Sequence, residues 1–214
     1  MKKNVVGIIK DGIINSSKFG KYPDSKLRIL WIMKEVNGKN ENESWDLRDY
    51  LRNISLKKYK VYEYWKATYG LVIKVSWGLL EGVKELKEKQ DVEEISCILD
   101  YIAVININKE PGKRRTGKKR LENAYAEYSN ELRKQIEDIK PNIIIGGSTL
   151  WLFYKNDFFH DNSYSNFDDK NWGEFKNGIL WINAYHPNQK KIKHKEYYKH
   201  IWEKFEENRS RLMV

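Results

Sequence analysis

The sequence contains very little cysteine, since Cys97 is the only one among its 214 residues. One thiol excludes a disulfide framework within the chain, and it also excludes any zinc or iron–sulfur site held by four cysteines of one chain. Cys97 lies in the apolar run 95–99, and we therefore expect it to be a buried, inert thiol.

Long apolar runs, internal repeats and low-complexity linkers are also absent. Near the amino terminus the apolar stretch covers only residues 5–9, which is too short for the apolar region of a signal peptide. No run approaches the length of roughly 20 residues that a membrane-spanning helix needs. We therefore expect a single cytoplasmic, monomeric domain over residues 1–214, long enough to bury a full core.

Acidic residues are fewer than basic ones, and the net charge is +10. This excess favours a polyanionic partner, although a composition rich in Lys, Asn, Ile and Tyr is also typical of an A+T-rich genome. The positions of the charges are more informative, because Lys and Arg dominate segments 113–120 and 190–199. The two segments indicate either a rim that follows a phosphate backbone or solvated charged loops.

Short apolar runs predict four buried strands, at 27–33, 101–107, 142–146 and 179–184. Between them, apolar residues recur at three- and four-residue steps, which predicts long helices over 65–83, 121–139 and around 197–205. Shorter helices are expected from a Ser44 cap to Arg52, from the capping box of Asp91 and Glu94, and from Leu150 onward. Residues 155–178 read as irregular and end in an Asn-Gly turn. This alternation predicts an α/β fold with a parallel sheet covered on both faces.

Polar residues follow three of the predicted strands. They are residues 34–38 (Lys-Glu-Val-Asn-Gly), 106–109 (Asn-Ile-Asn-Lys) and 185–188 (Tyr-His-Pro-Asn). In an open α/β sheet, ligands bind just beyond the carboxyl ends of the strands. We therefore expect Glu35, Asn106 and His186 to face one cleft, within about 12 Å of one another, which is the span of a flipped nucleotide.

The order and chemistry of these segments resemble the uracil-DNA glycosylase superfamily. In its iron–sulfur branch the first strand ends in Gly-Glu-Ala-Pro-Gly, which residues 34–38 match at the acid and at the last glycine. The second strand ends in Asn-x-x-Lys before a proline-containing loop, as residues 106–111 do, and the last strand ends in His-Pro, as at 186–187. The resemblance covers roughly residues 25–205 and implies a three-layer α/β/α sandwich with a four-stranded parallel sheet.

The resemblance also implies a reaction, the excision of a deaminated or modified base from DNA by hydrolysis of its N-glycosidic bond. That step builds positive charge on the sugar and negative charge on the departing base. By the resemblance, Glu35 acts near the sugar, His186 binds the leaving oxygen, and Asn106, with Asn108 beside it, reads the flipped base. The four cluster cysteines of that branch are absent, and no metal or other cofactor is expected.

Basic residues near two of these strand ends are the candidates for contacts with DNA, either single- or double-stranded. They are Lys109, Arg114, Arg115, Lys118, Lys190, Lys191 and Lys193.

Other interpretations remain open for the individual residues. Glu35 could be a loop salt-bridge partner, Asn106 could close a strand end through the backbone, Lys109 could be a solvated loop lysine and His186 a turn histidine. Lys34 and Asn37 also replace the glycine and the proline of the family motif. An alternative function is therefore a catalytically silent member of the same fold that binds nucleic acid or nucleotide, for instance in conflict between phage and host. A nucleotide-processing enzyme on a Rossmann-like sheet is a third.

Overall fold

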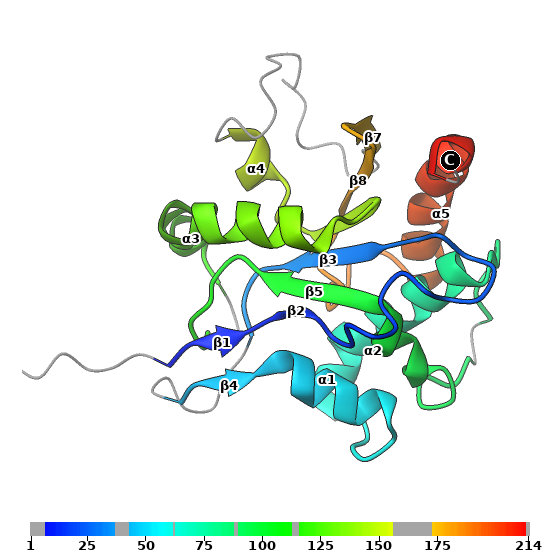
Figure 1. The fold of residues 1–214 in the computed structure, drawn as a ribbon, viewed down its shortest axis with the longest axis horizontal. Coiled ribbons are helices and arrows are strands. Elements are labelled where there is room, and N and C mark those ends of the chain that lie inside the picture. The colour runs from blue at the N-terminus through cyan, green and yellow to red at the C-terminus, as the bar shows by residue number, and fades with distance from the viewer. Residues whose placement is uncertain are drawn as a thin grey trace, which may run out of the picture.

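The computed structural model describes residues 7–36, 43–61, 63–87, 90–112, 116–155 and 173–212, which form an α/β fold around a six-stranded mixed sheet (Figure 1). From one edge of the sheet to the other, the strands are β2 (Gly12–Ile13), β5 (Ile102–Asn106), β3 (Ile29–Met33), β6 (Ile143–Gly147), β8 (Ile179–Ala184) and β7 (Gly173–Lys176). The four inner strands are mutually parallel, as the apolar runs predict.

The two outer strands are antiparallel to their neighbours and were not predicted. β2 is only two residues long and gives no periodic signal, and β7 lies in a stretch that reads as irregular. The turn between β7 and β8 does follow the sequence, because Asn177 and Gly178 both have positive φ, 52° and 78°. This is the backbone that a two-residue hairpin turn requires.

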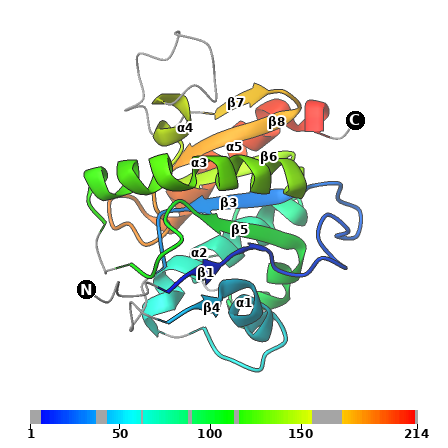
Figure 2. The same cartoon turned by 60° about the vertical axis from the view of Figure 1, so that its left-hand side comes forward.

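Helices cover both faces of the sheet, which explains why the inner strands are apolar on both sides. Side chains of one parity, such as Ile29 and Trp31, face a core formed with α1 (Leu47–Ser55), α2 (Glu63–Leu80) and α5 (His194–Leu212). The opposite parity packs against α3 (Lys118–Ile139) and α4 (Trp151–Lys155). Figures 1 and 2 show α3 on one face of the sheet and α1 with α2 on the other.

Local polar groups and backbone conformation set the ends of the helices, and the cap of α1 differs from the sequence prediction. α1 is capped by Asp46, whose carboxylate accepts from the Arg48 N–H, whereas the Ser44 hydroxyl accepts from the Ile8 N–H at 2.9 Å. α3 ends as predicted before Pro141, with Lys140 in the left-handed conformation (φ 50°).

The short helix before β5 is a 3₁₀ helix, η1 (Ser96–Tyr101), and its geometry exposes Cys97. The prediction of a buried thiol is therefore wrong. The Ser96, Ile98 and Leu99 side chains occupy the buried positions of η1 instead.

A small parallel pair, β1 (Ile9–Lys10) and β4 (Trp45–Asp46), lies beside the main sheet. It is tied to the end of β5 by a hydrogen bond from the Ile9 N–H to the Lys109 carbonyl, 2.7 Å long. In the part of the chain that the structure describes, no helix combines the length and the apolar character needed to cross a bilayer.

Candidate functional site

The carboxyl ends of the four parallel strands lie side by side. They form the border of the sheet that is called its carboxyl edge here. Glu35 comes two residues after β3, Asn106 is the last residue of β5, Ser148 follows β6, and His186 comes two residues after β8. The register pairs Met33 with Asn106, and β6 separates β3 from β8. The three segments singled out from the sequence therefore share one edge, as expected from parallel pairing.

Glu35 is held in a fixed position by three donors. Its Oε2 accepts from Asn108 Nδ2 at 3.0 Å and lies 3.3 Å from Arg120 Nε, while its Oε1 accepts from the Thr116 hydroxyl. Only 3% of the side chain is exposed, whereas Arg120 is 39% exposed. Glu35 is thus a desolvated carboxylate whose counter-charge comes from the first turn of α3.

The loop after β5 packs closely over this carboxylate because it contains a glycine. The Gly112 N–H donates to the Val36 carbonyl at 2.7 Å. A Cβ atom added at Gly112 would collide with the Glu35 carboxyl group. The close approach of the loop to Glu35 therefore requires glycine at this position.

His186 is fixed from two sides. Its backbone N–H donates to Ser148 Oγ at 2.9 Å, and its ring Nδ1 accepts from the Asn188 N–H at 3.2 Å. Burial, and then the positive charge of Lys34, lower the pKa of His186 to about 4. Because Nδ1 is an acceptor, the neutral ring carries its proton on Nε2. His186 is therefore a neutral hydrogen-bond donor near pH 7.

Lys34 is a cation that interacts electrostatically with both Glu35 and His186. Burial lowers the pKa of Lys34, and the charge of Glu35 opposes that shift. Lys34 therefore links the two strand ends electrostatically, because it interacts with Glu35 after β3 and lowers the pKa of His186 after β8.

The segment after β6 brings the His186 loop close to β3. The Ser148 N–H donates to the carbonyls of Gly146 and Ala184, at 2.9 and 2.8 Å. A Cβ at Gly147 would lie 3.0 Å from Met33 Sδ and 3.3 Å from Pro187 Cδ. Through its N–H and its hydroxyl, Ser148 therefore bonds both Ala184 and His186 and fixes the end of β8 against β6.

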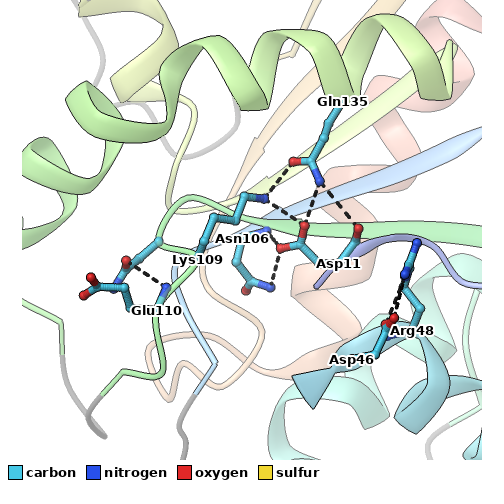
Figure 3. Close-up of polar contacts among 8 residues, drawn as sticks. Asp11, Asp46, Arg48, Asn106, Lys109, Glu110 and Gln135 are labelled. Atoms are coloured by element: carbon cyan, nitrogen blue, oxygen red, sulfur yellow. Dashed lines mark hydrogen bonds and ion pairs between the residues drawn. The ribbon is translucent and has the colours of Figure 1, made fainter. Parts of the chain in front are cut away.

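A second group of buried polar side chains surrounds Asp11 (Figure 3). Asp11 Oδ1 accepts from Lys109 Nζ at 2.8 Å and from Gln135 Nε2 at 2.9 Å. Asp11 Oδ2 accepts from the Asn106 backbone N–H at 2.8 Å and from Asn106 Nδ2 at 3.2 Å. Lys109 Nζ also donates to Gln135 Oε1 at 2.7 Å. The network joins the residue between β1 and β2, the end of β5 with the loop after it, and helix α3.

The prediction that Lys109 contacts DNA is wrong. The Lys109 side chain is 1% exposed, as is its partner Asp11. A buried ammonium needs a carboxylate and further hydrogen bonds to offset its lost hydration, and Asp11 and Gln135 supply them. Lys109 is therefore a structural residue that fastens the loop after β5.

Asn108 also differs from its predicted role in base recognition. Its Nδ2 donates to Glu35, and its Oδ1 accepts from the Glu110 N–H at 3.2 Å. Both ends of this buried amide are engaged. The geometry gives Asn108 a supporting role toward Glu35.

The predicted DNA-binding residues fall into three groups. Arg114 and Arg115 lie outside the described residues. Lys118 is exposed at the start of α3, with its Nζ 5.3 Å from the centre of the Trp151 ring. Lys190, Lys191 and Lys193 are exposed in the loop that follows His186. That loop is ordered by Gln189, whose Oε1 accepts from the Ile192 N–H and whose Nε2 donates to the Ile192 carbonyl, both at 2.9 Å.

A separate hollow of about 360 Å³ lies beside the start of β8, at the end of the strands opposite the carboxyl edge. Ile136 and Lys140 at the end of α3, the β7–β8 turn and Trp181 line it. It contains none of the residues predicted for the site.

Asp11, Arg120 and Ser148 contribute to the site and were not assigned roles in it from the sequence. Asp11 lies 95 residues from Asn106, and the two-residue strands on either side of it, β1 and β2, have no sequence signal. Arg120 belongs to a basic segment that reads as exposed, yet its guanidinium turns inward to Glu35. Only Ser148 carried a usable signal, because it follows a predicted strand and two glycines.

No protein-family model matches this chain, and no curated protein is significantly similar to it in sequence. The chemistry of the site therefore has to be inferred from its geometry.

The lowered pKa of His186 predicts a pH-dependent stability. The unfolded side chain titrates near 6.5 and the folded one near 4, so between these values the unfolded state binds the proton and the folded state does not. Stability should therefore fall as the pH falls from 6.5 to 4. We expect His186→Asn to lose less stability over this interval than the wild type, measured by urea denaturation at each pH.

Asn188→Ala is the control for this experiment, because it changes the same loop, keeps the backbone N–H and removes no titrating group. It should retain the wild-type pH dependence. An identical loss of stability in His186→Asn and the wild type would contradict the lowered pKa.

Proposed function

We propose that this chain is a DNA glycosylase-like protein that flips a deaminated or modified base out of DNA and hydrolyses its N-glycosidic bond. The observation that carries the proposal is the placement of a desolvated carboxylate, Glu35, and a neutral Nε2–H imidazole, His186, at one edge of the sheet. The parallel β5-β3-β6-β8 core with helices on both faces is compatible with the three-layer sandwich of the uracil-DNA glycosylase superfamily. This relationship is part of the proposal.

The two groups suit the two charges of the reaction. Cleavage leaves the sugar with oxocarbenium character, which a nearby carboxylate stabilises while it orients a water molecule. The departing base gains negative charge on an oxygen, which a fixed donor such as His186 Nε2–H stabilises. A neutral imidazole can do this without first losing a proton, as in other enzymes that keep a catalytic histidine uncharged. Lys34 adds a positive charge close to His186.

One observation favours a second candidate, a catalytically silent nucleic-acid-binding protein of the same fold. Arg120 forms an ion pair with Glu35, and Gly112 packs over the same carboxylate. In this state the carboxylate is occupied by protein groups. Catalysis would then require Arg120, or the loop that includes Gly112, to release Glu35 when DNA binds.

A single experiment separates the two candidates. The protein is incubated in excess with single- and double-stranded oligonucleotides that each carry one deaminated or modified base, and abasic sites are then cleaved with alkali. A glycosylase gives an alkali-labile break at the modified base. Binding without any break, on every base tested, would favour the silent protein.

DNA binding is expected to depend strongly on salt through the loop after β8. Each lysine that neutralises a phosphate contributes about 0.7–0.9 to the slope of log affinity against log salt. Replacing Lys190 and Lys193 with alanine should therefore reduce that slope by about 1.4–1.8, measured by fluorescence anisotropy from low to moderate salt. Both lysines are exposed, so the stability of the fold should change little.

The matched control replaces Lys58 and Lys60, two exposed lysines in the loop after α1. In Figure 1 this end of α1 lies away from the carboxyl ends of β3 and β5. The control should keep the wild-type slope. Equal slopes in all three proteins would remove the loop after β8 from the DNA-binding surface.

A further inference from the structure

Lys34 places an amine at the carboxyl edge of the sheet. It directly follows β3, and its backbone is fixed there because its carbonyl accepts the Asn108 N–H at 2.9 Å. The side chain is half-buried. It is close enough to the loop after β8 for its charge to lower the pKa of His186. Lys34 therefore belongs to the polar groups that surround the proposed site.

The Lys34 amine is left without a protein partner at this edge. Among the residues that the structure describes, none forms a hydrogen bond or an ion pair with its Nζ. Both carboxylate oxygens of the adjacent Glu35 are engaged by other donors. Lys109, by contrast, lies 2.8 Å from Asp11. The fold thus uses Lys109 to hold itself together and leaves Lys34 available to a ligand.

Burial makes the amine of Lys34 more reactive than that of an exposed lysine. Burial lowers the pKa of Lys34, and the charge of Glu35 opposes this shift without cancelling it. A lowered pKa leaves a larger share of neutral amine near neutral pH, and the neutral amine is the form that attacks a carbonyl carbon. Desolvated lysines of this kind form Schiff bases with carbonyl substrates.

The proposed excision leaves a carbonyl compound at the same edge. A sugar that has lost its base opens to an aldehyde at C1′, the atom to which the base was bonded. Glu35 and His186 are proposed to act on the two ends of that bond, and Lys34 directly precedes Glu35 in the chain. The product of the first reaction is therefore a substrate of the class that a lysine amine attacks.

We propose that Lys34 is a further catalytic residue, which forms a Schiff base with an abasic sugar and gives the protein an abasic-site lyase activity. The proposal rests on the proposed function for placing the sugar at this edge. It does not follow from the resemblance to the uracil-DNA glycosylase superfamily, because the family motif has a glycine where this chain has Lys34.

The steps of this reaction balance with water as the only other reactant. Nζ of the neutral amine bonds to C1′, and the aldehyde oxygen leaves as water with the two hydrogens of the amine, which gives an imine. The protonated imine makes the hydrogens on C2′ acidic. When one of them passes to a water molecule, a C2′–C3′ double bond forms and the C3′–O bond breaks, with its electron pair on the departing phosphate. Hydrolysis of the imine then restores Lys34 and releases an unsaturated aldehyde.

The activity can be tested on DNA from which the base has already been removed. The protein is incubated with an oligonucleotide that carries one abasic site, in the presence of sodium cyanoborohydride, which reduces the imine to a stable secondary amine. We expect a covalent protein–DNA adduct on a denaturing gel, and mass spectrometry of the digested adduct should place it on Lys34. Without the reductant, the strand should break at the abasic site before any alkali is added. No adduct, or an adduct only on other lysines, would overturn the proposal.

Lys34→Arg keeps the positive charge and removes the amine that can form an imine. It should therefore keep its affinity for the abasic oligonucleotide and lose both the adduct and the break. The matched control is Lys190→Arg, which makes the same change at an exposed lysine of the loop after β8 and should keep both. An undiminished adduct in Lys34→Arg would overturn the proposal. Mapping the adduct in the wild type decides the question even where the variant folds poorly.

The outcome also separates this proposal from the proposed function. A protein that forms the adduct on Lys34 but leaves every modified base in place would support the lyase and contradict the excision. A protein that excises a base and forms no adduct would support the excision and overturn the lyase.

Discussion

Replacing His186 with alanine is expected to slow base excision by about 10²- to 10³-fold, the usual effect of removing one donor to a developing oxyanion. His186 is suited to this role because its backbone is tied to Ser148, and Nδ1 is occupied by the Asn188 N–H. Its Nε2–H is therefore a directed donor. The rate is measured in single turnover with saturating enzyme, which separates chemistry from binding and product release.

Glu35→Gln is the companion to this variant. It should slow excision while DNA affinity is retained, because glutamine keeps the shape of the side chain and loses its charge. The two changes act on opposite ends of the same breaking bond, and their effects need not add. The control is Asn188→Ala, which keeps the N–H that holds the ring. Full activity in both His186→Ala and Glu35→Gln would show that the catalytic residues lie elsewhere.

Lys109→Met is expected to destabilise the protein by about 3–5 kcal/mol, because it leaves the Asp11 carboxylate buried without its cation. Each side chain of the pair is 1% exposed, and the two charged atoms are 2.8 Å apart. Removing one member therefore exposes the full desolvation cost of the other. The free energy of unfolding is measured by urea denaturation.

The double variant Asp11→Asn/Lys109→Met should recover more than half of this loss, since replacing both charges of a buried pair is often neutral. Lys199→Met is the control. Lys199 pairs with Glu203 at 3.7 Å on the surface of α5, where the two side chains are 69% and 49% exposed, and its loss should cost less than about 1 kcal/mol. A Lys109→Met protein as stable as the Lys199→Met protein would contradict the buried ion pair.

Asn106 links the polar groups at the end of β5 to the buried ion pair that stabilises the fold. Its amide is bonded to the same carboxylate that Lys109 neutralises. A change at Asp11 is therefore expected to affect the stability of the fold and the position of the Asn106 amide together, whereas a change at His186 is expected to affect the proposed excision and the pH dependence of stability.

Much of the scaffold could be predicted from local pattern. The four apolar runs gave the four parallel strands to within two residues at each end, because strands buried on both faces must be continuously apolar. The apolar residues at three- and four-residue steps located α2, α3 and α5, because a helix that packs on the sheet has an apolar face toward it. Edge strands β2 and β7 were missed, since a two-residue strand or a polar hairpin arm buries too little to leave a pattern.

By itself, the sequence determined that Glu35, Asn106 and His186 lie at or just after the carboxyl ends of parallel strands, and the parallel arrangement then places them at one edge of the sheet. Only the tertiary structure decided which polar groups there are engaged by the protein. Lys109 pairs with Asp11 across 98 residues, and Arg120 turns to Glu35. Such pairs form because burial requires each charge to find a partner, and which partner is within reach depends on how distant segments pack, which no local pattern encodes.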